Sequence, residues 1–167
     1  MMDDPMAIEG RVHWELFHED GTLKAEGWAE NVVTQVGDQM YAERGAGIGT
    51  LGAPTGMKLG TGSTAAAKTG AGAALVTYLA NSHQAFDAGF PASALSGSLR
   101  QITYKVSFAA GKATTSSPIT EAVIVNEALA DATSAAAATV SRFILTGIGS
   151  KAATDTLTLT WTHTLGT

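Results

Sequence analysis

The sequence predicts a mainly-β domain, a jelly-roll-like β-sandwich with one short helix near its N-terminal hairpin. Many short segments alternate apolar and polar residues with a period of two, which is the spacing of a half-buried strand. Glycine-containing turns separate these segments, and helical spacing of apolar residues is clear only over residues 34–44. Many short strands with few helices favour a sandwich or jelly roll over an α/β fold.

The chain has the length of one ordinary domain. Its 167 residues are enough for a sizeable core, and no linker or repeat divides them. Residues 1–8 precede the first alternating segment and include Pro5, which cannot donate to a strand ladder. We therefore expect an N-terminal arm over 1–8 and a single β-sandwich domain over 9–167.

The first elements are a hairpin and a helix. Residues 9–17 and 22–28 alternate as two strands, and Asp20-Gly21 between them is typical of a hairpin turn. Asn31 or Thr34 then caps a helix over about 34–44, and Gly45 ends it.

The remaining strands are separated by small-residue loops. Residues 45–56 and 62–74 are predicted loops, and 75–80 fits either a strand or a helical turn. Ile124 lies between two valines, which indicates burial on both faces of its strand. The predicted strands after the helix cover 57–61, 83–90, 98–109, 118–127, 139–148 and 155–165.

The last predicted strand has an unusual second face. Apolar or bulky residues alternate with a threonine row, which carries no charge and consists of Thr156, Thr158, Thr160, Thr162 and Thr164. A solvated sheet face more often carries lysine or glutamate, whereas threonine hydroxyls can satisfy one another across strands while their methyls pack. We therefore expect the threonine row to face a neighbouring subunit or another sheet.

Composition fits either a surface that is covered by other subunits or a small domain with a neutral surface. Charged residues make up 15% of the chain, below the usual figure of about a quarter. Residues 1–43 hold ten acidic and two basic residues, and the remainder holds five acidic and eight basic residues. This asymmetry, which begins at Asp3 and Asp4, permits head-to-tail contact between copies and argues against nucleic acid as a partner of the acidic end. No signal peptide or membrane span is expected.

The sequence contains no strong motif for catalysis or for binding a metal or cofactor. There is no cysteine, and His13, His18, His83 and His163 show no metal-ligand spacing, so no metal site or other cofactor is predicted. The G-x-G-x-x-G pattern at 47–52 follows a helix rather than a strand, which is the wrong context for a dinucleotide. Glu121 lies in an apolar run and is expected to pair with Arg100, Lys105 or Arg142. No catalytic residue is predicted.

Four stretches, in order, resemble a family of small virion proteins of tailed bacteriophages, which act as capsid cement (decoration) proteins or as tail appendage proteins. They are ENVVTQVGDQMYAERG at 30–45, MKLGTGSTAAAKT at 57–69, VSFAAGKATTSSPITEAVIVNE at 106–127 and SRFILTGIGSKAATDTLTLTWT at 141–162. Lys68 departs from the family pattern, which has an acid in that loop, and so does the run Val123–Val125, which usually contains glycine.

The resemblance implies a non-enzymatic protein of the virion exterior. Its expected partners are the major capsid protein and further copies of itself, as a homotrimer, without nucleic acid or membrane. A tail, neck or fibre-base component is the alternative within this class. A carbohydrate-binding β-sandwich is the alternative of another class, with Trp14, Trp28 and Trp161 as its aromatic candidates. Trp14 and Trp161 lie on apolar strand faces and are expected in the core, which leaves Trp28. The candidate interface comprises the threonine row, Asp3, Asp4 and Trp28.

Overall fold

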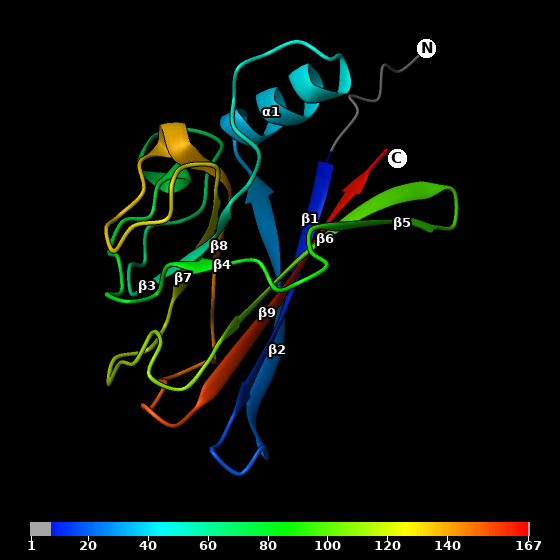
Figure 1. Ribbon diagram of the computed structural model, residues 1–167. Helices are drawn as coiled ribbons and strands as arrows, with labels where there is room; N and C mark the ends of the chain where they lie inside the picture. The colour runs from blue at the N-terminus through cyan, green and yellow to red at the C-terminus, as the bar shows by residue number, and fades with distance from the viewer. Residues whose placement is uncertain (1–7, 167) are drawn as a thin grey trace.

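The computed structural model describes residues 8–166, which form nine strands and one α-helix (Figure 1). Two short 3-10 turns, η1 (Gly70–Ala73) and η2 (Ala136–Ala138), lie in the loops. The elements are β1 (Ile8–Phe17), β2 (Leu23–Val33), α1 (Gln35–Gly45), β3 (Gly56–Gly60), β4 (Gln84–Ala85), β5 (Ala92–Ser96), β6 (Leu99–Phe108), β7 (Glu121–Val125), β8 (Thr139–Ile144) and β9 (Thr156–Leu165).

All nine strands belong to one antiparallel sheet, in the order β4-β3-β7-β8-β2-β1-β9-β6-β5. The sheet curls until the segment after β4 meets β6, where the Asp87 N–H donates to the Lys105 carbonyl at 2.9 Å. The mainly-β class with one helix is therefore confirmed. A jelly-roll sandwich of two separate sheets is not confirmed, because hydrogen bonds connect the strands into one sheet.

The predicted hairpin and helix are confirmed, although β2 continues to Val33 rather than ending at residue 28. The predicted arm over 1–8 is wrong at Ile8, and its other residues lie outside the described part of the chain. β1 and β2 form the predicted hairpin, and Gly21 in its turn has φ of +80°. Thr34 is the N-cap of α1, since its hydroxyl accepts a hydrogen bond from the Gly37 N–H at 3.1 Å. Ile8, assigned to the arm, is the first residue of β1 and pairs with Leu165.

The prediction of a strand over 83–90 is largely wrong. Only Gln84 and Ala85 pair as β4, because Asp87 begins a turn in which its carbonyl accepts from the Phe90 N–H at 3.0 Å. The Asp87 carboxylate also accepts from the Ser107 N–H and hydroxyl of β6 at 2.9 and 2.7 Å. The strand that the pattern missed is β5, which forms a hairpin with β6 around Gly97.

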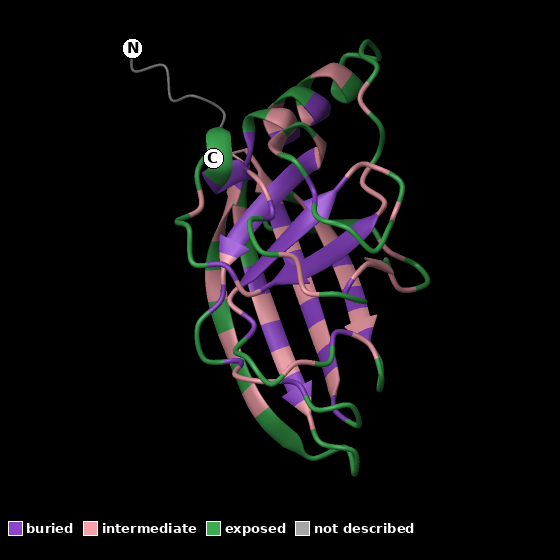
Figure 2. Ribbon diagram, turned by 90° about the vertical axis from the view of Figure 1, so that its left-hand side faces the viewer, coloured by how far each residue is buried: buried purple, intermediate pink, exposed green. Residues whose placement is uncertain are grey.

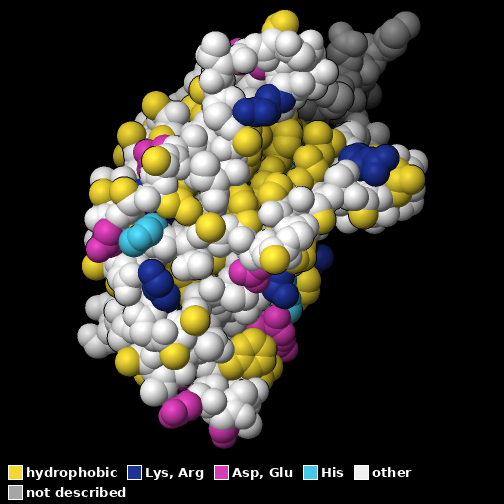
Figure 3. Space-filling model, viewed as in Figure 1, with side chains coloured by type: hydrophobic (Ala, Val, Ile, Leu, Met, Phe, Trp, Pro, Cys, Tyr) yellow, Lys and Arg dark blue, Asp and Glu magenta, His cyan; other side chains and the backbone are white. Residues whose placement is uncertain are grey.

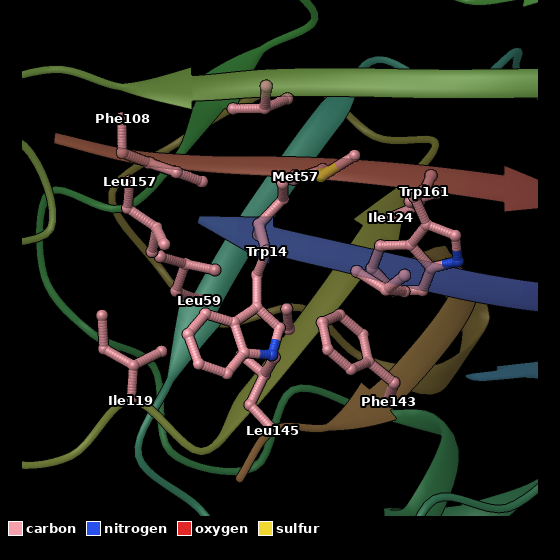
Figure 4. Close-up of a cluster of buried hydrophobic side chains, with 14 of the residues drawn as sticks. Trp14, Met57, Leu59, Phe108, Ile119, Ile124, Phe143, Leu145, Leu157 and Trp161 are labelled. Carbon is pink, nitrogen blue, oxygen red and sulfur yellow. The ribbon is translucent and has the colours of Figure 1, made fainter. Parts of the chain in front are cut away.

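The curl brings two halves of the sheet face to face around the core. The open half consists of β6, β9, β1 and β2, and the covered half consists of β3, β7 and β8. Trp161 of the open half packs edge-on against Phe143 of the covered half, with ring centroids 4.6 Å apart (Figure 4). Trp14 is also buried, so the assignment of Trp14 and Trp161 to the core is confirmed.

The two halves differ in what covers their outer faces (Figure 2). β1 and β9 of the open half alternate between buried and more exposed residues, whereas β3 and β7 are buried at every position. The chain's own loops cover the covered half, where Leu75, Tyr78 and Leu129 pack against Val123 and Val125. Burial of Ile124 and both its neighbours confirms the prediction for that strand.

Candidate interaction surface on the open half of the sheet

The outer face of the open half carries the threonine row. β9 lies between β1 and β6, with its leucines, Trp161 and His163 directed to the core and its threonines on the other side. Each threonine of the row is partly exposed. The prediction that the row faces a neighbouring subunit or another sheet remains a prediction, and the structure places the row on the outside of the curl.

The neighbouring strands supply the charge that the threonine row lacks. Thr160 lies between His13 of β1 and Lys105 of β6, and the next outward-facing row places Thr162 beside Arg11. Side-chain rows across antiparallel strands lie about 5 Å apart, so these groups form one continuous polar surface. Neutral threonines therefore separate a column of charges on β1 from Lys105.

Trp28 is the most prominent side chain of this face. It lies opposite His13 in the β1–β2 ladder, and its side chain is 60% exposed. The rings of Trp28 and His13 stack with centroids 4.1 Å apart, and the guanidinium carbon of Arg11 lies 4.4 Å from the Trp28 ring centroid. Stacking and a cation–π contact hold a large aromatic ring in place at the surface.

An open groove runs beside Trp28 across the ends of the strands. Its walls combine aromatic, charged and hydroxyl groups, namely Trp28, Arg11, Glu30, Gln101, Thr162 and Thr164. This groove joins Trp28 to the threonine row, so these candidate interface residues share one surface. The other two, Asp3 and Asp4, lie outside the described residues.

The interface predicted from the sequence did not include Arg11, His13 or Lys105. The signal was present, because buried apolar residues flank each position: Val12 and Trp14 alternate with Arg11 and His13, and Tyr104 and Val106 flank Lys105. This alternation predicts that all three face away from the core. What the pattern could not supply was the register that places His13 beside Thr160 and Trp28.

A second surface feature lies away from this face. Figure 3 shows an apolar hollow between α1 and the β5–β6 hairpin. Leu95 on β5 and Ile48 after α1 are large apolar side chains that are 66% and 67% exposed. Because they belong to β5 and to the segment after α1, the two elements near the hollow, this side of the molecule is the rival to the Trp28 face as a contact surface.

His163 is a buried, hydrogen-bonded core histidine, as predicted. The Tyr41 hydroxyl lies 2.7 Å from His163 Nδ1 and 2.7 Å from the Tyr104 hydroxyl, and Ser141 Oγ lies 3.2 Å from His163 Nε2. Burial lowers the pKa of His163 to about 3, so the ring is neutral at pH 7. Burial also raises the pKa of Tyr41 and of Tyr104.

Ser141 and His163 have the side-chain types of a nucleophile and a base, but both are fully buried. The Ser141 hydroxyl donates to the Val32 carbonyl at 3.0 Å. A substrate atom has no access to this serine in the folded chain, so the pair holds β2, β8 and β9 together instead.

Glu121 forms the predicted buried ion pair, and its partner is Arg142, with Oε2 and Nη2 2.8 Å apart. Both side chains are completely buried. The Glu121 carboxylate also accepts from three backbone N–H groups of the covering loops, those of Gly62, Val76 and Thr77, at 3.0, 3.1 and 2.7 Å. Glu121 thus fixes residues 62–77 on the covered half, which explains why 75–80 is irregular rather than a strand or helix.

Comparisons with known proteins give no match: no family model matches the chain, and neither a search of curated proteins nor one of solved structures found a similar protein. Within residues 8–166, no helix has the length and apolar character that crossing a membrane requires.

Proposed function

We propose that this chain is a non-enzymatic structural protein of a tailed-bacteriophage virion, a capsid cement protein that binds the outer shell through the outer face of the open half. The observation that carries the proposal is Trp28, held in place on an otherwise polar sheet face beside the threonine row. Exposed aromatic side chains set among hydrogen-bonding groups are typical of protein-binding surfaces.

The order of the four sequence stretches supports the virion assignment. Residues 30–45 contain the end of β2 and α1, and 141–162 contain the β8–β9 region. The jelly-roll-like β-sandwich and the homotrimer expected from the resemblance belong to this proposal. A cement protein stabilises a shell by adding contact area across capsomer junctions at many equivalent sites, so modest affinity at each site suffices.

The test is co-sedimentation with empty capsids built from the major capsid protein of the same virus. We expect Trp28→Ser and Thr160→Lys to reduce capsid binding by at least about tenfold while thermal unfolding stays cooperative. Leu95→Ser is the matched control on the rival surface and should leave binding unchanged. If Trp28→Ser and Thr160→Lys bind capsids fully while Leu95→Ser loses capsid binding, the outer face of the open half is not the contact surface.

A tail, neck or fibre-base protein is the alternative within the same class. The same surface would then bind a tail component instead of the shell. Co-sedimentation with isolated tails rather than capsids, lost in Thr160→Lys, identifies this alternative.

A carbohydrate-binding module is the second candidate, and one observation favours it. Sugar rings stack on exposed aromatic rings, and the groove beside Trp28 presents hydrogen-bonding groups from Glu30, Gln101 and Thr162. Glycan-array binding that Trp28→Ser abolishes would support this function, whereas an array without binding removes it.

A further inference from the structure

We propose that His13, Glu15 and Glu26 form a binding site for a divalent first-row transition-metal ion on the outer face of the open half. One imidazole nitrogen and one carboxylate oxygen from each glutamate lie within 4.8 Å of one another. Imidazole and carboxylate together are a donor set for zinc-like ions, whereas calcium and magnesium prefer oxygen donors alone.

The strand register is what assembles this donor set. His13 and Glu15 are two residues apart on β1, so they project from the same face, and Glu26 lies directly opposite Glu15 on β2. The distances from His13 are 3.9 Å from Nδ1 to Glu15 Oε2 and 3.6 Å from Nε2 to Glu26 Oε2. Small side-chain rotations bring a single ring nitrogen and both carboxylates to one ion.

The Glu15–Glu26 pair is the independent reason to expect a cation here. Like charges directly opposite each other on adjacent strands destabilise a sheet. Among the described residues, no lysine or arginine forms a salt bridge with either glutamate, and the ion-pair partner of each is His13. A divalent ion bound between the two carboxylates removes this repulsion.

Stacking against Trp28 restricts the orientation of the His13 ring. Its ring stacks on the imidazole at 4.1 Å with an interplanar angle of 20°, which limits the rotation of His13. The His13 side chain is 20% exposed and those of Glu15 and Glu26 are 34% and 55% exposed, so an ion reaches the site from solvent. Three protein ligands leave a coordination position for water or for a ligand from a partner molecule.

Calorimetric titration of the untagged full chain with Zn²⁺ at pH 7.5 tests the site. We expect one saturable ion per chain, and at least about tenfold weaker binding in each of His13→Asn, Glu15→Gln and Glu26→Gln. The matched controls are His18→Asn, in the hairpin turn, and Glu30→Gln, on the same face beside Arg11, which should bind within about twofold of the unmodified chain.

Tryptophan fluorescence gives a second readout that does not depend on the heat of binding. Cu²⁺ should quench the fluorescence of Trp28 at the same stoichiometry, since Trp14 and Trp161 are buried. Trp28→Phe should abolish this saturable quenching but retain Zn²⁺ binding. Absence of saturable Zn²⁺ binding, or equal weakening in the control variants, overturns the site. Neither result bears on capsid binding, so the proposed function is tested separately.

Discussion

The outer faces of the two halves of the sheet differ in exposure: loops of the chain cover one face and leave the other open. On the covered half, loops 61–80 and 126–138 lie over β3 and β7, and the buried charges there are paired, Glu121 with Arg142 and Lys58 with Glu127. On the open half, Trp28 is 60% exposed and two glutamates lie opposite each other. The covered face is therefore completed within the chain, whereas the open face keeps a large aromatic side chain and an uncompensated carboxylate pair at the surface.

The largest expected effect comes from disrupting the covered half. Arg142→Met leaves the Glu121 carboxylate buried without its cation, and breaking a buried pair in this way costs about 3–5 kcal/mol of unfolding free energy. Urea unfolding of the variant measures this loss.

The matched control on the open half is Glu26→Gln. It removes a charge from a solvent-accessible pair with Glu15, so in metal-free buffer we expect a change within about 0.5 kcal/mol, on the stabilising side. Equal losses in Arg142→Met and Glu26→Gln would contradict the distinction between the two halves.

The next largest effect is the dependence of stability on pH, which arises from His163 in the core between the two halves. Because the pKa of His163 is about 3 in the folded chain and 6.5 in a free side chain, the unfolded chain alone takes up this proton between these values. Stability therefore falls as pH falls through 6.5, by up to about 2 kcal/mol at pH 5. The carboxylates with lowered pKa, Asp20, Asp131 and Asp155, lose their contribution only at lower pH.

His163→Gln should remove this slope between pH 6.5 and 5, as followed by urea unfolding at several pH values. His18→Asn, in the exposed hairpin turn, serves as the control and should retain it. A slope unchanged in His163→Gln would show that another group is responsible.

The smallest expected effect on stability is that of Thr160→Lys on the open half. Its side chain points outward between His13 and Lys105, and solvent-facing strand positions tolerate lysine within about 0.5 kcal/mol. Thermal unfolding measures this, and sedimentation equilibrium measures self-association. A folded variant that has lost its association places the threonine row between subunits, whereas an unfolded one contradicts the outward placement.

Much of the fold could be predicted from periodicity. The β1–β2 hairpin, α1 with Thr34 as its cap and the all-buried β7 follow from local pattern, because each depends on residues close in sequence. The failures were at 83–90 and β5, where a turn at Asp87 tied to Ser107 decides the structure. That contact joins residues 20 positions apart, and alternation carries no information about it.

The candidate surface was predictable only in part. The threonine row was visible as a period of two, and Trp28 was recognised as the least core-like tryptophan. The β1–β2 register brings the other charged side chains of this surface together, because it aligns Glu15 with Glu26 and His13 with Trp28. The sequence alone does not give this register. A hairpin register depends on the geometry of its turn, and here a shift between Leu16 and Phe17 alters it further.

Hydroxyl-radical footprinting of the free and capsid-bound chain tests most directly whether the outer face of the open half is the contact surface. Trp28, Ile48 and Leu95 are all highly exposed in the free chain, at 60%, 67% and 66%, and therefore report on the two rival surfaces in one experiment. We predict that oxidation of Trp28 falls strongly on capsid binding, while oxidation of Ile48 and Leu95 is unchanged. Protection of Ile48 and Leu95 with undiminished oxidation of Trp28 would contradict this and assign the contact to the side of the molecule that carries β5 and the segment after α1.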